Sequence, residues 1–163
     1  MKINKPNIEA HLNGTIEELR RSYESKGIKA SGRWGESLES YIEESEGSVK
    51  VGIKALDYIQ YSEYGRGPNK APSVDAAKKL YPIILEWASV KGISVTNLKA
   101  FAFRTALKIV YDGIKVPNKY NVGGVVGDVL TEDWARGVVE VVGSGYLESF
   151  NSEILRNIKR SWQ

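Results

Sequence analysis

The chain has 163 residues, of which 42% are hydrophobic and 26% are charged, so it fits one folded domain with a real core. Its 23 basic and 20 acidic side chains are mixed along the sequence and leave a net charge of +3, which argues against a dedicated reader of nucleic-acid sequence. The absence of cysteine excludes disulfides, thiolate nucleophiles and sulfur-ligated metals, and it fits assembly in a reducing cytosol. No apolar run approaches the roughly 20 residues that span a bilayer, and residues 1–6 lack the apolar core of a signal peptide.

The N-terminal third of the chain predicts a helix followed by a β-hairpin. The helix is indicated by apolar residues that recur at spacings of three and four: Ile8, Leu12, Ile16, Leu19 and Tyr23. Gly27 is placed to end this helix in a left-handed cap. A polar connection over residues 29–35 carries Trp34, which we expect to reach a neighbour. Residues 38–45 and 48–53 then form the hairpin around Glu46 and Gly47, because Val49, Val51 and Ile53 alternate with small or polar residues.

The middle of the chain predicts two capped helices after an ambiguous segment. Residues 58–65 are rich in tyrosine and form either a third strand or a short helical turn, and residues 66–72 form a loop. Ser73 caps a helix up to Lys91, which Pro82 should kink or split. Asn97 caps the next helix, residues 98–112, whose expected buried face comprises Leu98, Phe101, Ala102, Thr105 and Ile109.

The C-terminal third predicts a loop and then further helices. Residues 114–128 contain Pro117 and two adjacent glycines, and we expect a mobile or interface loop there. Thr131 caps a helical region that Gly143 to Gly145 should break, and a strand over residues 138–142 is an alternative. Two apolar stripes are expected in this region: Trp134, Val138 and Val141, and then Leu147, Phe150, Ile154, Ile158 and Trp162. The predicted fold is a single α+β domain over residues 1–163, with an N-terminal helix, a small antiparallel sheet (the hairpin plus a further strand) and several helices packed on it.

Candidate catalytic and metal-binding groups are sparse. His11 is the single histidine and has no partner motif, so a packed or surface role is favoured over catalysis. The Glu43–Glu46 cluster lacks the spacing of a calcium loop, and the glycines around Arg66 lack the lysine and hydroxyl residue of a phosphate loop. Glu63 and Glu86 could form an acid–base pair, but a bond from a backbone amide or Arg66 to Glu63 is the favoured reading. We therefore predict no catalytic residue, no metal and no cofactor.

The remaining pattern indicates interaction with other molecules. Tyrosine, tryptophan and arginine are enriched at protein interfaces and their hot spots. The candidate interface residues are Trp34, Tyr58, Tyr61, Glu63, Tyr64, Arg66 and Tyr120. The tyrosines could instead cover the chain's own core. Another alternative is nucleic-acid binding by the tyrosine cluster together with basic side chains: Arg66, Lys70, Arg156, Lys159 and Arg160. A small enzyme is the weakest of these hypotheses.

One stretch of the sequence resembles a known family. Ala30-Ser31-Gly32-Arg33, the strand end Val49-Lys50-Val51-Gly52 and the run Tyr58-Ile59-Gln60-Tyr61-Ser62-Glu63-Tyr64-Gly65 follow one another in the order found in small tail-completion or head–tail joining proteins of long-tailed bacteriophages. The resemblance covers about residues 8–72. Here a helical insert, about residues 74–113, follows, and Val116-Pro117-Asn118-Lys119-Tyr120 could stand for the family's Pro-Phe element.

The resemblance implies a structural role without catalysis. Such a chain would be an α+β subunit of a self-assembled ring, a hexamer or dodecamer, in the neck of the virion, assembled in the bacterial host cytoplasm. Its partners would be the portal-side connector or adaptor and the tail tube or tail hub, and DNA would pass through the channel without sequence readout. The resemblance gives Glu63 and Gly65 structural roles and implies no membrane contact.

Overall fold

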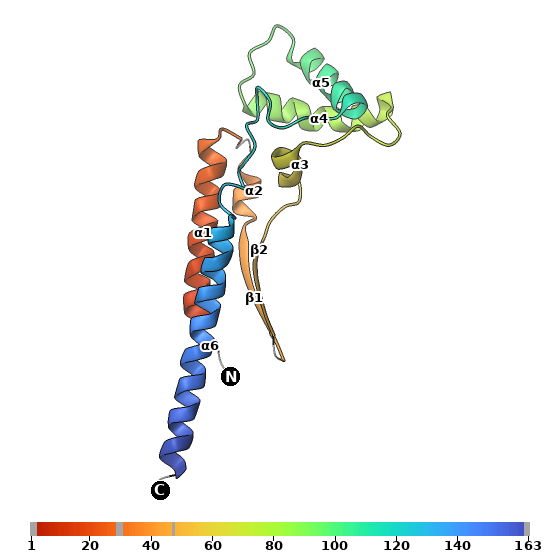
Figure 1. The fold of residues 1–163 in the computed structure, drawn as a ribbon. Coiled ribbons are helices and arrows are strands. Elements are labelled where there is room, and N and C mark those ends of the chain that lie inside the picture. Colours follow the sequence, from red (N-terminus) through yellow and green to blue (C-terminus); the bar gives the residue numbers. More distant parts are fainter. Residues whose placement is uncertain (1–2, 29–30, 47, 162–163) are drawn as a thin grey trace. The chain divides into compact units, whose positions relative to one another are not determined.

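The computed structural model describes residues 3–28, 31–46 and 48–161, which form six helices and one two-stranded antiparallel sheet (Figure 1). The protein is α+β, as predicted. Its contacts divide the chain into two compact units, each assembled from separated segments. Unit 1 comprises residues 1–22, 37–55 and 126–163, and unit 2 comprises residues 23–36 and 56–125. The division into two units does not test the predicted single-domain organisation, which remains a prediction.

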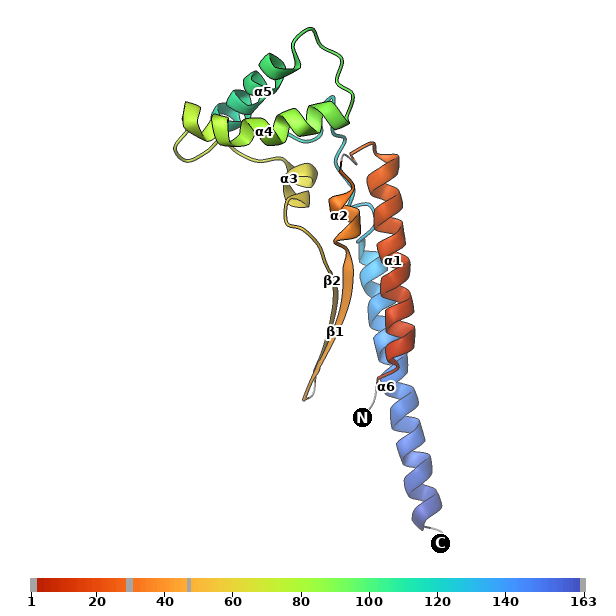
Figure 2. The ribbon, with the colours of Figure 1, turned by 180° about the vertical axis from the view of Figure 1, so that it is seen from behind.

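Unit 1 is built from two helices that run side by side and a hairpin. The helices are α1 (Lys5–Ser25), up to residue 22, and α6 (Glu132–Ser161), and the strands are β1 (Glu39–Ser45) and β2 (Ser48–Lys54) (Figures 1 and 2). The predicted stripe of α1 is confirmed, since Ile8, Leu12, Ile16, Leu19 and Tyr23 are all at most 6% exposed. Ile3, Ile8 and Leu12 form a core that is covered by apolar side chains of the hairpin and of α6: Ile42, Val49, Val51, Ile53, Trp134, Val141, Val142 and Tyr146.

The hairpin has one face toward this core and one face away from it. Ile42 pairs with Val51 and Ser40 with Ile53, which places alternate residues on the core side. On the other face Tyr41 lies over Gly52, where a Cβ atom would come within 2.7 Å of the Tyr41 ring. Gly47, at the predicted turn, lies outside the described residues. No further strand joins the hairpin in the described part of the chain, because the ambiguous segment after it is helical.

Unit 2 contains the short helices α2 (Arg33–Glu36) and α3 (Ile59–Tyr64) and the longer pair α4 (Val74–Val90) and α5 (Leu98–Asp112). Both predicted N-caps are confirmed: the amide of Ala76 donates to Ser73 and the amide of Ala100 donates to Asn97. The core between α4 and α5 consists of Ala77, Ala106 and Val110 with larger side chains around them: Leu80, Tyr81, Ile84 and Leu107.

The buried face of α5 differs from the predicted one. Ala102 and Ile109 are buried as expected, but Ala106 and Val110 complete the face. Small alanines at this position let the two helices approach closely. Phe101 and Thr105 are therefore turned partly outward, where they line a groove. Pro82 does not split α4, which continues through it, and the proline ring lies on an exposed part of the helix.

Helix α6 is unbroken, so the predicted interruption at Gly143 to Gly145 and the alternative strand over residues 138–142 are wrong. Thr131 caps the helix through the amide of Trp134, at 3.3 Å. Gly145 faces the start of α1 so closely that a Cβ atom would lie 2.8 Å from the backbone nitrogen of Asn4, and a small residue is therefore required for packing and does not end the helix. None of the helices in the described ranges is long and apolar enough to cross a membrane.

Candidate functional site

The seven candidate interface residues all belong to unit 2, but they occupy different environments. Trp34, on α2, is only 1% exposed, and its ring lies 5.0 Å from that of Tyr23. The prediction that Trp34 reaches a neighbouring molecule is therefore wrong, because its indole is part of the chain's own core. Lys29 and Ala30, in the same connection, and Trp162, at the end of the second predicted stripe, lie outside the described residues.

Tyr58 joins this buried group from the start of α3. Its hydroxyl is hydrogen-bonded to Tyr23 and to the backbone of Trp34. Burial, followed by the bond to Tyr23, raises the pKa of Tyr58 to about 12. Part of the side chain still reaches solvent, at 38% exposure. Tyr58 thus links α3 to α2, and only part of its side chain contributes to the protein surface.

Glu63 supports the turn after α3. Its carboxylate is buried and accepts a hydrogen bond of 2.8 Å from the amide of Val125. The predicted structural role for Glu63, as an acceptor for a backbone amide, is confirmed. The side-chain amide of Asn121 donates in the same region to the carbonyl of Ser62, at 2.7 Å. A charged acceptor bonded to a backbone amide is among the stronger hydrogen bonds of a folded protein.

Gly65 and Gly113 complete the attachment of the segment from Ile114 to Val125. Arg66 and Ile114 exchange two backbone hydrogen bonds of 2.8 Å, and both glycines have positive φ, 74° and 78°. A Cβ atom on Gly65 would overlap the carbonyl oxygen of Ile114. Residues 114–125 are therefore held against α3 by several bonds. Mobility of the longer predicted loop, residues 114–128, stays a prediction.

Two tyrosines of α3 and the arginine that follows the helix form what we call the tyrosine surface: Tyr61, Tyr64 and Arg66. Tyr61 is 56% exposed and Tyr64 is 78% exposed. The guanidinium of Arg66 lies over the ring of Tyr61, 5.7 Å from its centre, and donates to the side chain of Asn69. The arginine is thereby fixed against an aromatic ring that remains open to solvent.

Tyr120 belongs to a different contact. Its ring meets that of Trp87, on α4, edge to face at 6.1 Å, and the ammonium of Lys119 lies 5.5 Å from the centre of the same ring. The side chain is 47% exposed. Residues 118–121 form a tight turn with two backbone hydrogen bonds between Asn118 and Asn121, so Tyr120 is presented on a defined turn.

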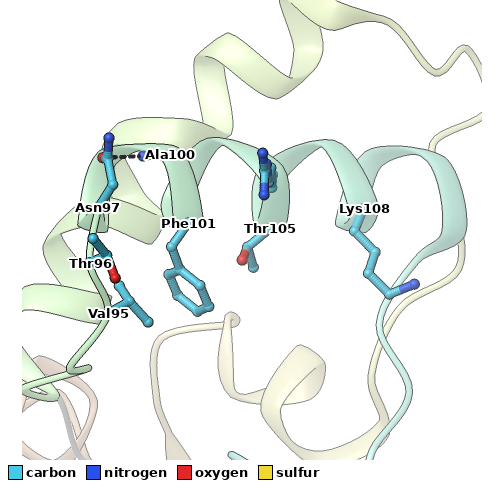
Figure 3. A pocket seen from close by; sticks show the side chains of 8 residues that line it. Val95, Thr96, Asn97, Ala100, Phe101, Thr105 and Lys108 are labelled. Carbon is cyan, nitrogen blue, oxygen red and sulfur yellow. Dashed lines mark hydrogen bonds between the residues drawn. The ribbon is translucent and has the colours of Figure 1, made fainter.

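A groove along α5 is a feature that the sequence reading missed. It has a volume of about 590 Å³, and its lining is mainly apolar. Val95, Phe101 and Thr105 point to the same side of α5, with Lys108 further along it (Figure 3). Arg104 also lines the groove and is exposed. The alternation of apolar and basic side chains on one side of residues 98–108 was the signal that could have indicated it.

The groups considered for chemistry have separate partners. Glu63 binds the amide of Val125, whereas Glu86 lies 3.9 Å from Arg33. His11, in unit 1, stacks on Trp134 with 6.5 Å between ring centres. Within residues 3–28, 31–46 and 48–161, no three carboxylate or histidine side chains are grouped as a metal site would require.

Comparison of the chain with protein-family models, with curated proteins and with solved structures finds no match.

Proposed function

We propose that this chain is a structural subunit of a tailed-bacteriophage virion, a neck or tail-completion protein that assembles into a ring between the connector and the tail. The tyrosine surface is the observation that carries the assembly role. Two large aromatic side chains, Tyr61 and Tyr64, stand more than half exposed beside Arg66. Exposed aromatic residues next to arginine are the side chains that most often carry binding energy at protein interfaces.

The surroundings of the tyrosine surface support docking of a folded partner. The helix beneath it is held from behind by the bond between Glu63 and Val125 and by the backbone pairing of Arg66 with Ile114. A surface that is already ordered loses little conformational entropy when it binds. The assignment to a phage neck rests on the resemblance of residues 8–72, in which Glu63 and Gly65 belong to the quoted run.

Assembly is favoured over nucleic-acid binding by the way in which Arg66 is used. Its guanidinium is engaged with Asn69 and Tyr61 within the same unit. A guanidinium that already has an acceptor and an aromatic neighbour is less available to a phosphate group. A mobility-shift assay at low salt provides the comparison, since phosphate binding weakens steeply with salt.

The experiment for the proposed function measures assembly directly. The purified chain is run by size-exclusion chromatography with light scattering, alone and mixed with a phage connector or tail tube, and the complexes are imaged by electron microscopy. We expect closed rings, alone or on the partner. Tyr61→Ser with Tyr64→Ser should weaken assembly, whereas Tyr111→Ser, an equally polar change at a 48% exposed tyrosine of α5, should not. A chain that stays monomeric and joins neither partner would contradict the proposal.

A further inference from the structure

Helix α6 carries two apolar stripes, one in its first half and one in its second half. The first stripe, with Trp134, Val141 and Val142, packs on the core of unit 1. Leu147, Phe150 and Ile154 are instead 64%, 52% and 41% exposed. Gly145 faces Asn4, at the start of α1, and the residues of the second stripe all follow Gly145. The contacts that bury the first stripe therefore end before the second stripe begins.

The spacing of the second stripe is that of a helix that lies in a groove. Leu147, Phe150 and Ile154 stand at positions i, i+3 and i+7, and Leu155, 59% exposed, widens the stripe on one side. Amphipathic helices that dock into apolar grooves use anchors at this spacing. An exposed apolar patch of this kind on a folded chain marks an interaction site.

The groove along α5 has the matching character. Its lining includes the apolar side chains of Val95 and Phe101 and the basic side chains of Arg104 and Lys108. Lys108 lies further along α5 than Phe101 (Figure 3). Lys108 is paired with Asp112, at 3.0 Å. Arg104 is exposed and has no ion-pair partner within the described residues. The groove thus offers an apolar floor and one available cation.

The α6 stripe supplies the opposite charge. Glu153 follows Phe150 by three residues, so it lies one turn further along the same side of the helix. It is exposed and, like Arg104, has no ion-pair partner in the described part of the chain. Glu148, by contrast, already accepts a bond from Asn4, at 3.5 Å. On the α6 stripe, Glu153 follows Phe150 by three residues. In the α5 groove, Arg104 follows Phe101 by three residues.

We propose that the second half of α6, residues 147–155, docks into the α5 groove of a second copy of this chain, with Glu153 facing Arg104. The inference deepens the proposed ring function and rests on it for the closure of the ring. The two surfaces differ, so the contact is head-to-tail, and head-to-tail contacts generate a ring when the rotation between subunits closes. Complementary charges set the register of the helix in the groove.

A charge exchange between two variants tests this contact. Glu153→Arg alone and Arg104→Glu alone each place like charges together, and each should weaken self-association about tenfold or more in analytical ultracentrifugation. An equimolar mixture of the two variants should recover association, because each α6 then meets a groove of opposite charge in the other variant. Recovery on mixing requires a contact between chains, since within either variant the two charges are alike.

An apolar variant gives an independent readout with a matched control. Phe150→Asp should weaken association on the order of thirtyfold, as expected for loss of a central anchor. Ser152→Asp adds the same charge to an exposed position on the far side of the helix and should leave association unchanged. Circular dichroism should show equal helicity for both variants, because neither side chain is buried in the described structure.

The outcomes separate this inference from the proposed function. A wild-type chain that stays monomeric at all concentrations, a mixture that does not recover, or a Phe150→Asp variant that associates like wild type would each overturn the α6 contact. In the last case, binding of the chain to a connector or tail tube would still support the neck function. Association lost in the single variants and regained in the mixture supports the contact.

Discussion

Glu63 and Val125 are joined by a hydrogen bond of 2.8 Å from the Val125 amide to the Glu63 carboxylate, although 62 residues separate them along the chain. The bond attaches the end of the segment from Ile114 to the helix that carries the tyrosine surface. Glu63→Ala should lower the free energy of unfolding by about 1–3 kcal/mol, because a buried amide loses its charged acceptor. Chemical denaturation measures this change.

Two comparison variants show whether the acceptor itself is responsible. Glu63→Gln keeps an oxygen at the same place and should lose less than Glu63→Ala. Glu140→Ala, at an exposed position of α6, should change stability by no more than about 0.5 kcal/mol. Equal losses for the glutamine and alanine variants at residue 63 would show that the bond to Val125 does not carry the effect.

Gly65 should not tolerate a side chain. Its φ of 74° and the overlap that a methyl group would make with the carbonyl oxygen of Ile114 are both unfavourable. Together they predict that Gly65→Ala costs at least about 2–3 kcal/mol. Gly67→Ala is the matched control, since nothing lies within 4 Å of its Cβ position. Thermal unfolding of both variants distinguishes them, and similar midpoints would contradict the close packing of residues 65 and 114.

Tyr58 should make stability depend on pH in the alkaline range. Its pKa is raised from 10.0 to about 12 in the folded chain. The stabilising contribution is therefore complete below pH 10, where the hydroxyl is neutral in both states, and is lost as the pH rises toward about 12, because the unfolded chain ionises first. The near-ultraviolet absorbance of tyrosinate should show one late-ionising tyrosine.

Tyr58→Phe should remove that late ionisation and flatten the alkaline loss of stability. Tyr64→Phe, at a side chain that is 78% exposed, should leave the late ionisation in place. If the late step persists in Tyr58→Phe, another tyrosine is responsible for it.

Two glycines of α6 should respond in opposite directions to the same change. Gly143→Ala should stabilise the protein by about 0.5–1 kcal/mol, because nothing lies within 4 Å of its Cβ position and alanine favours a helix. Gly145→Ala should destabilise it, because the new methyl group would lie 2.8 Å from the backbone nitrogen of Asn4. Urea unfolding of the pair reports both signs. A loss of stability in Gly143→Ala would indicate that the helix is interrupted there.

Local chemistry explains which parts of the fold could be predicted from sequence. The α1 stripe and the caps at Ser73, Asn97 and Thr131 depend on residues within a few turns, and all are confirmed. The run of glycines near Gly145 was misread because its reason is Asn4, which is far away in the sequence. Glycine within a helical segment is expected both where a helix is interrupted and where two chain segments pack closely, so the sequence does not separate these two cases.

The candidate site shows the same limit. Tyr61 and Tyr64 are exposed, as an interface requires, but Trp34 is buried against Tyr23. Composition alone does not distinguish an aromatic residue that is exposed and free to bind another protein from one that is buried in the core of its own chain. The groove on α5 was missed because Phe101 and Thr105 share a helical period with Ala102 and Ile109, and the packing of alanines against α4 decides which of them face inward.

Because each unit is assembled from separated segments, the two units become complete at different times during synthesis. Unit 2 is complete once residue 125 has been made, whereas unit 1 also needs residues 126–163. At about 5–20 residues per second the ribosome takes roughly 2–8 s to add that part. During this time the hairpin and the first turns of α1 have been made, but the helix that covers their apolar side chains has not. Until α6 has been made, the core around Ile8 and Leu12 therefore lacks the apolar side chains of that helix and has only the hairpin to cover it. This interval is when a chaperone has most to bind.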